Sequence, residues 1–158
     1  MAAQSKNMRV YEEYTDRIRK GDLQAVYDFF APDFHTHVTR RVAPEFVGTD
    51  IRPGEVMFWE ESANAFSNRE FFVEKFVAVD AEDIIVVNWS MTGTHDKGTY
   101  FGAAPTGNKV ELNGTAILRL KDGKFVEHWG GPHCMHAIGL LAGIAAPTKL
   151  TAEQLNVN

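Results

Sequence analysis

The sequence has little cysteine, little basic charge and no long apolar run. One cysteine among 158 residues, Cys134, excludes an internal disulfide and a zinc site built from cysteines. The net charge of −5 leaves no basic footprint of the kind that nucleic-acid binding needs. No apolar stretch approaches the roughly 20 residues that span a bilayer, and the polar N-terminus lacks a hydrophobic signal core. We therefore expect a cytoplasmic protein that binds neither nucleic acid nor membrane.

The composition is otherwise that of an ordinary globular domain, with 44% hydrophobic and 23% charged residues. The length suits one domain, so we expect a single domain over residues 1–158, with a core at about 8–145 and a polar C-terminal tail. The unusual feature is six histidines. The unperturbed pKa of histidine lies nearest neutrality, so the question is which of the six carry chemistry.

The first part of the chain has the apolar period of helices. Val10, Tyr14 and Ile18 are spaced by four residues, which is typical of one helix face, and Gly21 follows as a stop. Pro32 ends a second apolar segment that Asp22 begins. The sequence predicts helices over 7–20, from Asp22 to Phe30 and over 54–66, and a short extended segment over 34–38.

The second half changes to the composition and period of strands. The pair Asp122-Gly123 predicts a tight hairpin between the last two strands. Helices followed by a run of antiparallel strands indicate an α+β domain, in which a curved antiparallel sheet packs on three N-terminal helices and encloses a pocket. The predicted strands cover residues 70–79, 84–94, 110–120 and 125–129, and a short helix follows at about 134–145.

Alternation along the strands predicts which side chains face that pocket. In the strand from residue 84, Trp89 and Met91 share a face with His95, and this large apolar set should face the helices. Glu127 and Trp129 share a face of the last strand, and continued extension would carry His133 to the same face.

Three histidines, His95, His133 and His37, could therefore converge on the pocket. His35, His128 and His136 are interpreted as structural or exposed. The pairs His35-x-His37 and His133-x-x-His136 specify no third ligand, so we expect no metal. Substrate contacts are expected from the apolar pocket walls and from one carboxylate: Trp59, Trp89, Met91, Phe66, Trp129 and Glu127.

Three segments in order also form a recognisable pattern. They are Phe30-Ala31-Pro32-Asp33-x-x-x-His37, Trp89-x-x-x-Gly93-Thr94-His95-x-x-Gly98 and Arg119-x-x-Asp122-Gly123-Lys124-x-x-Glu127-His128-Trp129. Over residues 8–145 this pattern resembles the SnoaL-like polyketide cyclase (ester cyclase) family. The resemblance implies the nuclear-transport-factor-2-like cone, in which a curved sheet wraps around helices and a deep pocket. It also implies ring closure by intramolecular aldol condensation without a cofactor.

One departure from the family pattern concerns the general base. The resemblance implies an aspartate four residues after the tryptophan of Glu-x-Trp, and this chain has His133 at that position. Histidine can act as a general base near neutral pH. In this hypothesis His133 removes the proton, His95 stabilises or protonates the alkoxide, and His37 shapes the pocket.

Several functions remain open at this point. The leading hypothesis is a cofactor-independent enzyme that performs acid–base chemistry on a hydrophobic carbonyl or polyketide-like compound. The same fold hosts isomerases, dehydratases and epoxide hydrolases, and the sequence does not choose among them. A non-catalytic protein that binds a small ligand is the other class. The expected partners are a small hydrophobic substrate and a second copy of the chain, in a dimer or tetramer.

Overall fold

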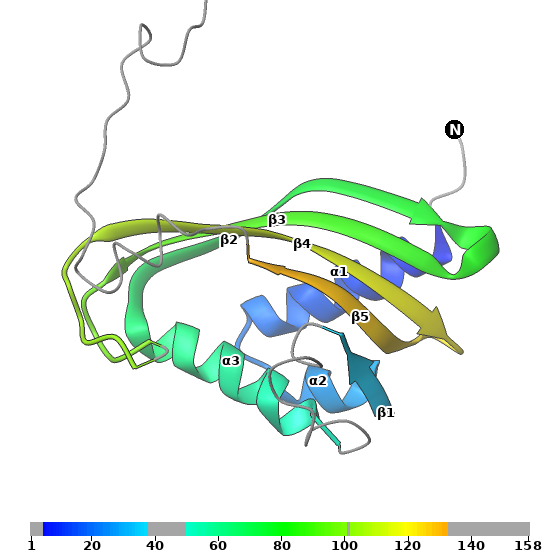
Figure 1. The fold of residues 1–158 in the computed structure, drawn as a ribbon, viewed down its shortest axis with the longest axis horizontal. Coiled ribbons are helices and arrows are strands. Elements are labelled where there is room, and N and C mark those ends of the chain that lie inside the picture. The colour runs from blue at the N-terminus through cyan, green and yellow to red at the C-terminus, as the bar shows by residue number, and fades with distance from the viewer. Residues whose placement is uncertain (1–4, 38–49, 101, 133–158) are drawn as a thin grey trace, which may run out of the picture.

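A computed structural model describes residues 5–37, 50–100 and 102–132. Within these residues the helices lie in the first half of the chain and four of the five strands follow them (Figure 1). The helices and long strands predicted from the sequence are confirmed, with shifts at their ends. The elements are α1 (Lys6–Arg19), α2 (Gln24–Phe29), β1 (Phe30–Thr36), α3 (Arg52–Ala65), β2 (Phe66–Val79), the 3₁₀ turn η2 (Asp80–Glu82), β3 (Ile84–His95), β4 (Lys109–Lys121) and β5 (Lys124–Pro132).

The strands form one sheet in the order β1-β5-β4-β3-β2, and this sheet arches over the helices (Figure 1). The predicted α+β class, with a curved sheet on three N-terminal helices, is confirmed. Strands β2 to β5 are antiparallel to their neighbours, but β1 pairs with β5 in parallel, so the sheet is mixed. Helix α2 leads directly into β1 at the edge of the sheet, where Pro32 is tolerated because an edge strand can spare a donor.

Strand β2 begins where α3 ends, with no loop between Ala65 and Phe66. The sequence predicted this strand only from residue 70, because Ser67, Asn68 and Arg69 are polar and favour a turn. Asn68 has a positive φ of 49°, and the pairing of β2 with β3 shifts register between Ser67 and Glu70. The strand thereby bends around the end of the sheet and continues to Val79.

The core has two parts. Beneath the first part of the sheet, Tyr11 and Tyr14 of α1 pack edge-on against Phe125 and neighbouring aromatic rings. The second part lies at the end of the sheet where β2 begins and β3 ends, which we call the closed end. There Phe66 and Tyr100 pack with Met91 of β3. Edge-to-face aromatic pairs are favoured over sandwiches because positive ring edges meet negative faces.

The predicted face alternation is confirmed for β3 and wrong for β5. In the pairing of β4 with β5, Leu120 lies opposite Phe125, whereas the next residue of β4, Arg119, lies opposite Glu127. Val126 is thus an extra residue in β5, which makes a β-bulge. An extra residue in one strand inverts the faces that follow it. Glu127 therefore lies on the outer face of the sheet with Arg119, and His128 lies opposite the buried Leu118 on the inner face. Trp129 follows on the outer face.

Some predictions fall beyond the described residues. His133, His136, Cys134, the helix at 134–145 and the polar tail lie outside them. A single domain over residues 1–158 stays a prediction. No helix within the described part of the chain is long and apolar enough to cross a membrane.

Candidate functional site

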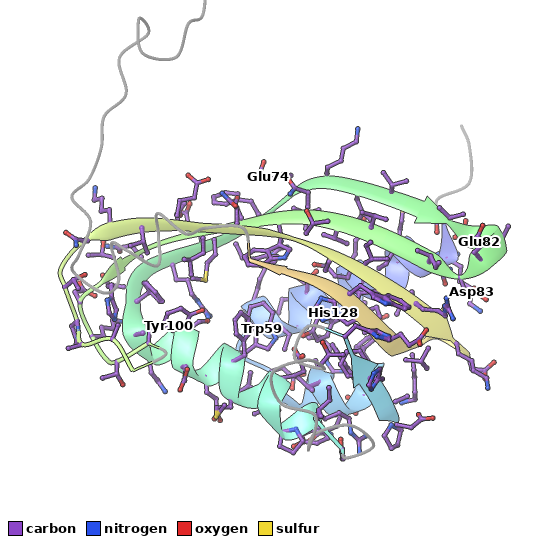
Figure 2. The ribbon with its side chains drawn as sticks, in the orientation of Figure 1. Trp59, Glu74, Glu82, Asp83, Tyr100 and His128 are labelled. Carbon is purple, nitrogen blue, oxygen red and sulfur yellow. The ribbon has the colours of Figure 1, made fainter. Side chains whose placement is uncertain are left out.

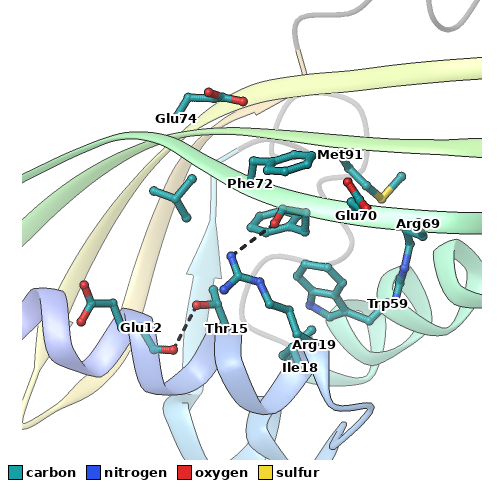
Figure 3. A pocket seen from close by; sticks show the side chains of 12 residues that line it. Glu12, Thr15, Ile18, Arg19, Trp59, Arg69, Glu70, Phe72, Glu74 and Met91 are labelled. Atoms are coloured by element: carbon teal, nitrogen blue, oxygen red, sulfur yellow. Dashed lines mark hydrogen bonds between the residues drawn. The ribbon is translucent and has the colours of Figure 1, made fainter.

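A pocket of about 910 Å³ opens between α1, α3 and strands β2 and β3. We call it the inner pocket. Figure 3 shows Ile18 of α1, Trp59 of α3 and Met91 of β3 around it. Trp59 and Met91 were both predicted as substrate contacts, and the structure places both in the lining.

Trp59 and Phe71 form an aromatic wall of the inner pocket, and Trp89, predicted as a substrate contact, packs against Phe71 without lining the pocket itself. The rings of Trp59 and Phe71 are 5.7 Å apart, and Phe71 stacks on Trp89 at 6.0 Å with 19° between the planes. The indole of Trp89 lies over Gly114, where a Cβ atom would come within 2.6 Å of the ring. The missing side chain of Gly114 thus lets Trp89 lie flat against the sheet. Flat aromatic walls suit a planar aromatic or conjugated ligand.

Two arginines also line the inner pocket. Arg19 Nη2 donates to the carbonyl oxygen of Phe71 at 3.4 Å, drawn as a dashed line in Figure 3, and the guanidinium lies 5.6 Å from the Phe71 ring centre. Arg69 Nη1 donates to Ser62 Oγ on α3. Burial lowers the pKa of Arg69, because a desolvated cation is disfavoured. Glu12, Glu70 and Glu74 line the pocket as well, so the two arginines are local cations in a lining of mixed charge.

One side of helix α3 carries side chains with polar groups that contact its neighbours. Glu55, Trp59 and Ser62 follow at spacings of four and three, which places them on one side of the helix. Trp59 Nε1 donates to Tyr14 Oη at 2.8 Å. Burial raises the pKa of Glu55 to about 7, because ionising a desolvated carboxyl is costly. Burial also raises the pKa of Tyr14 well above its usual range, and the negative charge of Glu55 adds to this effect.

Sequence reasoning missed Glu55. A glutamate near the start of a helix is usually solvated, and its place one turn before a pocket tryptophan was the available signal. A carboxyl with a pKa near neutrality is half protonated at working pH, so it can remove or supply a proton.

His128 is the second titratable group on the inner face. Figure 2 shows Trp59 and His128 on the side of the sheet that faces the helices, whereas Glu74 points away. His128 Nδ1 lies 3.5 Å from Thr36 Oγ1. Burial, and to a smaller extent the nearby His37, lowers the pKa of His128 to about 4. The sequence placed His128 in the background because the bulge in β5 was not foreseen.

His95 lies at the closed end of the cone and is fully buried. Its Nε2 is 2.9 Å from the carbonyl oxygen of Gly98, and its Nδ1 is 3.5 Å from Thr106 Oγ1. A carbonyl only accepts, so Nε2 carries the proton and Nδ1 accepts from the hydroxyl. Phe66 packs beside this ring at 5.3 Å, in the core at the closed end. As far as the chain is described, neither side chain lines the inner pocket.

His37, Glu127 and Trp129 gather on the outer face of the sheet. The His37 ring stacks on Trp129 at 4.6 Å with 4° between the planes, and His37 Nε2 is 3.6 Å from Glu127 Oε1. Arg119 Nη1 is 3.0 Å from Glu127 Oε2. We call these four residues the outer cluster. Glu127 was predicted to contact substrate, but it lies across the sheet from the inner pocket and pairs with Arg119.

The described histidines do not meet at one place. His95 is held at the end of β3, and His37 stacks on the outer face of β5, so the structure does not bring these two together. Within residues 5–37, 50–100 and 102–132, no three His, Cys, Asp or Glu side chains are grouped so as to hold a metal ion.

The curved sheet wrapped on three helices, with a pocket inside, defines the nuclear-transport-factor-2-like fold. The chain belongs to the SnoaL-like polyketide cyclase family, whose model matches residues 8–137. The comparison with curated proteins found no match.

Three solved structures illustrate the similarity in fold. AclR, a candidate hydroxylase from Streptomyces galilaeus, is 21% identical with a TM-score of 0.70, over 98% of this chain and 90% of its own. IdmH, a candidate polyketide cyclase from Streptomyces antibioticus, is 25% identical with a TM-score of 0.67, over 87% of this chain and 99% of its own. A SnoaL-like polyketide cyclase candidate from Jannaschia sp. CCS1 is 18% identical with a TM-score of 0.69, over 93% and 100% of the two chains.

Proposed function

We propose that this protein is a cofactor-independent enzyme that closes a ring in a hydrophobic, polyketide-like carbonyl compound by intramolecular aldol condensation. Membership of the SnoaL-like family supports a cyclase-type enzyme. The observation that carries the proposal is Glu55, a buried carboxyl with a pKa of about 7, one helical turn from a pocket tryptophan.

In this mechanism Glu55 acts as the general base. Its carboxylate removes a proton from a carbon between two carbonyl groups, and the electron pair of that C–H bond forms an enolate. The enolate carbon attacks a ketone carbon of the same molecule, so one C–C bond forms and the ketone oxygen becomes an alkoxide. The proton that Glu55 removed is returned to the alkoxide, which completes a hydroxyl group and restores the carboxylate of Glu55, so no net proton or electron is gained or lost.

Tyr14 is suited to stabilise the alkoxide. Its Oη accepts from Trp59 Nε1 at 2.8 Å, and its raised pKa keeps the phenol protonated, so that its O–H can donate to a developing oxyanion. His128 is a poor general acid at neutral pH, since its pKa of about 4 keeps the ring neutral. The aromatic wall would hold the folded chain near its reactive geometry.

The catalytic roles of His133, His95 and His37 stay predictions. The geometry favours Glu55 over His95, because both ring nitrogens of His95 are engaged within the closed end. It also favours Glu55 over His37, which lies in the outer cluster. The cytoplasm remains our proposed location, and a dimer or tetramer our proposed assembly.

Glu55→Gln tests the proposal with a small probe, methyl 3-(2-naphthyl)-3-oxopropanoate, which carries a methylene between two carbonyls. In D2O the wild-type protein should accelerate deuterium exchange at this methylene, measured by NMR. E55Q should lower the rate above background by about 10²- to 10⁴-fold, as expected for loss of a general base.

The matched control is Glu60→Gln, which removes the same charge from the exposed side of α3 and should retain full exchange. Equal rates for E55Q and E60Q would remove Glu55 from the mechanism. A wild-type protein that binds the probe without accelerating exchange would instead support the non-catalytic binding protein. An isomerase would return the proton to another carbon, and a dehydratase would release water.

A further inference from the structure

Arg69 differs from the other buried or paired arginines of the described chain. Arg17 and Arg52 have a carboxylate oxygen at 2.7 Å, and Arg119 has one at 3.0 Å. Arg69 has no carboxylate within ion-pair distance among the described residues. Its Nη1 donates to the hydroxyl of the buried Ser62, and the phenol of Tyr100 is its nearest electrostatic partner.

Arg69 is half-buried, and this partial desolvation lowers its pKa, although a guanidinium stays charged at physiological pH. The side chain lines the inner pocket beside Trp59 and Met91 (Figure 3). Ser62 Oγ, which also donates to the Trp59 carbonyl oxygen at 3.3 Å, holds one edge of the guanidinium and leaves its other donors for a ligand.

We infer that Arg69 is a specificity residue that binds an acid group of the substrate, so that the inner pocket accepts an aromatic or conjugated compound bearing a carboxylate. The inference rests on the proposed function for the reaction, but the acid preference is a property of binding alone. The carboxylate accepts from the free N–H groups of Arg69, and the apolar body of the ligand lies against Trp59 and Phe71.

The net charge of −5 makes this preference informative. A protein with excess negative charge repels anions in general, so tighter binding of an acid requires a local cation. Arg19, at the same pocket, is already engaged by the Phe71 carbonyl oxygen and by the Phe71 ring. Arg69 is therefore the better placed of the two to receive the carboxylate.

Isothermal titration calorimetry with 2-naphthoate and the neutral 2-naphthamide tests this inference. The wild-type protein should bind the acid roughly ten- to a hundredfold more tightly than the amide, as expected for a charge-assisted contact. Arg69→Gln should abolish the preference while it leaves amide binding within about twofold. Arg9→Gln removes one charge from the exposed side of α1 and should leave the preference intact.

Arg69→Lys gives a second measure, because it keeps the charge and loses the planar fork. We expect a reduced preference that persists. Circular dichroism checks that each variant is folded, and if R69Q is unfolded the decision rests on R69K. Equal wild-type affinities for acid and amide, or an unchanged preference in R69Q or R69K, would overturn the inference.

The proposed base and the proposed acid-binding residue are tested independently. E55Q should retain the preference for 2-naphthoate even though it loses deuterium exchange. If E55Q exchanges normally while R69Q loses the preference, the proposed base is wrong and the acid site stands.

Discussion

Two histidines lie toward opposite ends of the inner side of the sheet, and the protein surrounds them differently. His95, at the end of β3, is fully buried, with a carbonyl oxygen 2.9 Å from one ring nitrogen and a threonine hydroxyl 3.5 Å from the other. His128, in β5, is half-buried, with a hydroxyl 3.5 Å from one nitrogen, and desolvation lowers its pKa to about 4. The two residues therefore differ both in exposure and in the partners of their ring nitrogens.

This difference distinguishes two ends of the cone: at one end the histidine stabilises the fold, and at the other end several titratable groups have shifted pKa values. At the closed end, backbone N–H groups of Thr106 and Gly107 donate to the His95 carbonyl oxygen, so the residue ties down the loop between β3 and β4. At the other end, Glu55, Tyr14 and His128 are poorly solvated groups whose pKa values are shifted. Shifted pKa values mark the region where proton transfer is expected.

The largest effect should come from His95→Gln. Glutamine has no nitrogen at the position of the ring Nδ1, so it cannot satisfy both partners at once, and a buried group left unpaired costs about 1–3 kcal/mol. With the lost ring packing, we expect the free energy of unfolding, measured in urea, to fall by about 3 kcal/mol. Deuterium exchange per folded molecule should be retained. A stable H95Q that has lost exchange would return His95 to the catalytic role predicted from the sequence.

His128 should make stability depend on acid pH. The unfolded chain binds a proton near the ordinary pKa of 6.5, and the folded chain only near 4, so unfolding takes up a proton between these values. Stability is lost as pH falls through this window, by about 2–3 kcal/mol at its end. His128→Gln should remove this loss in urea unfolding at several pH values. The half-buried control His35→Gln should keep it, and identical pH profiles for wild type and H128Q would contradict the assignment.

Glu55 should make stability depend on pH in the opposite direction. The folded chain keeps the proton up to a pKa of about 7, and the unfolded chain releases it near 4.5, so unfolding releases a proton between these values. Stability is full below pH 4.5 and falls as pH rises toward 7, by about 1–2 kcal/mol once solvent screening is allowed for. Relative to wild type, E55Q should gain stability at pH 8 and not at pH 4.5. A gain that is the same at both pH values would show that Glu55 is not titrating.

The smallest effect should come from the outer cluster. Glu127→Gln breaks a half-exposed ion pair with Arg119, and such pairs contribute about 0–1 kcal/mol. We expect a loss of unfolding free energy within that range, reduced further at high salt, and no change in deuterium exchange. A large loss of exchange in E127Q would place the reaction on the outer face.

The class of fold could be predicted because its signals are local. Apolar spacings of four fixed the first helix to within a residue at each end, and β-branched alternation located β3 and β4. The inner face of β3 was predicted correctly, since its pairing with β4 runs without a shift from Ile84 to Thr94.

The site could be predicted only in part, because three features depend on tertiary structure. The bulge in β5 lies between Phe125 and Glu127, where the strand has large residues and no glycine to announce it, and it exchanges the faces of Glu127 and His128. The pKa of Glu55 depends on burial, which the sequence does not contain. Arg69 was missed because the strand was predicted only from residue 70, whereas β2 begins at Phe66.

The parallel pairing of β1 with β5 bears on how the protein is made. Phe30 of β1 aligns with Phe125 of β5. During synthesis β1 is therefore made first among the described strands, but it can pair in the sheet only after β5 has been made. Pairings between distant parts of a chain form slowly, because a long loop must be closed first. The aromatic residues beneath β1 stay exposed until then, which makes the nascent chain most dependent on chaperones just before β5 is complete.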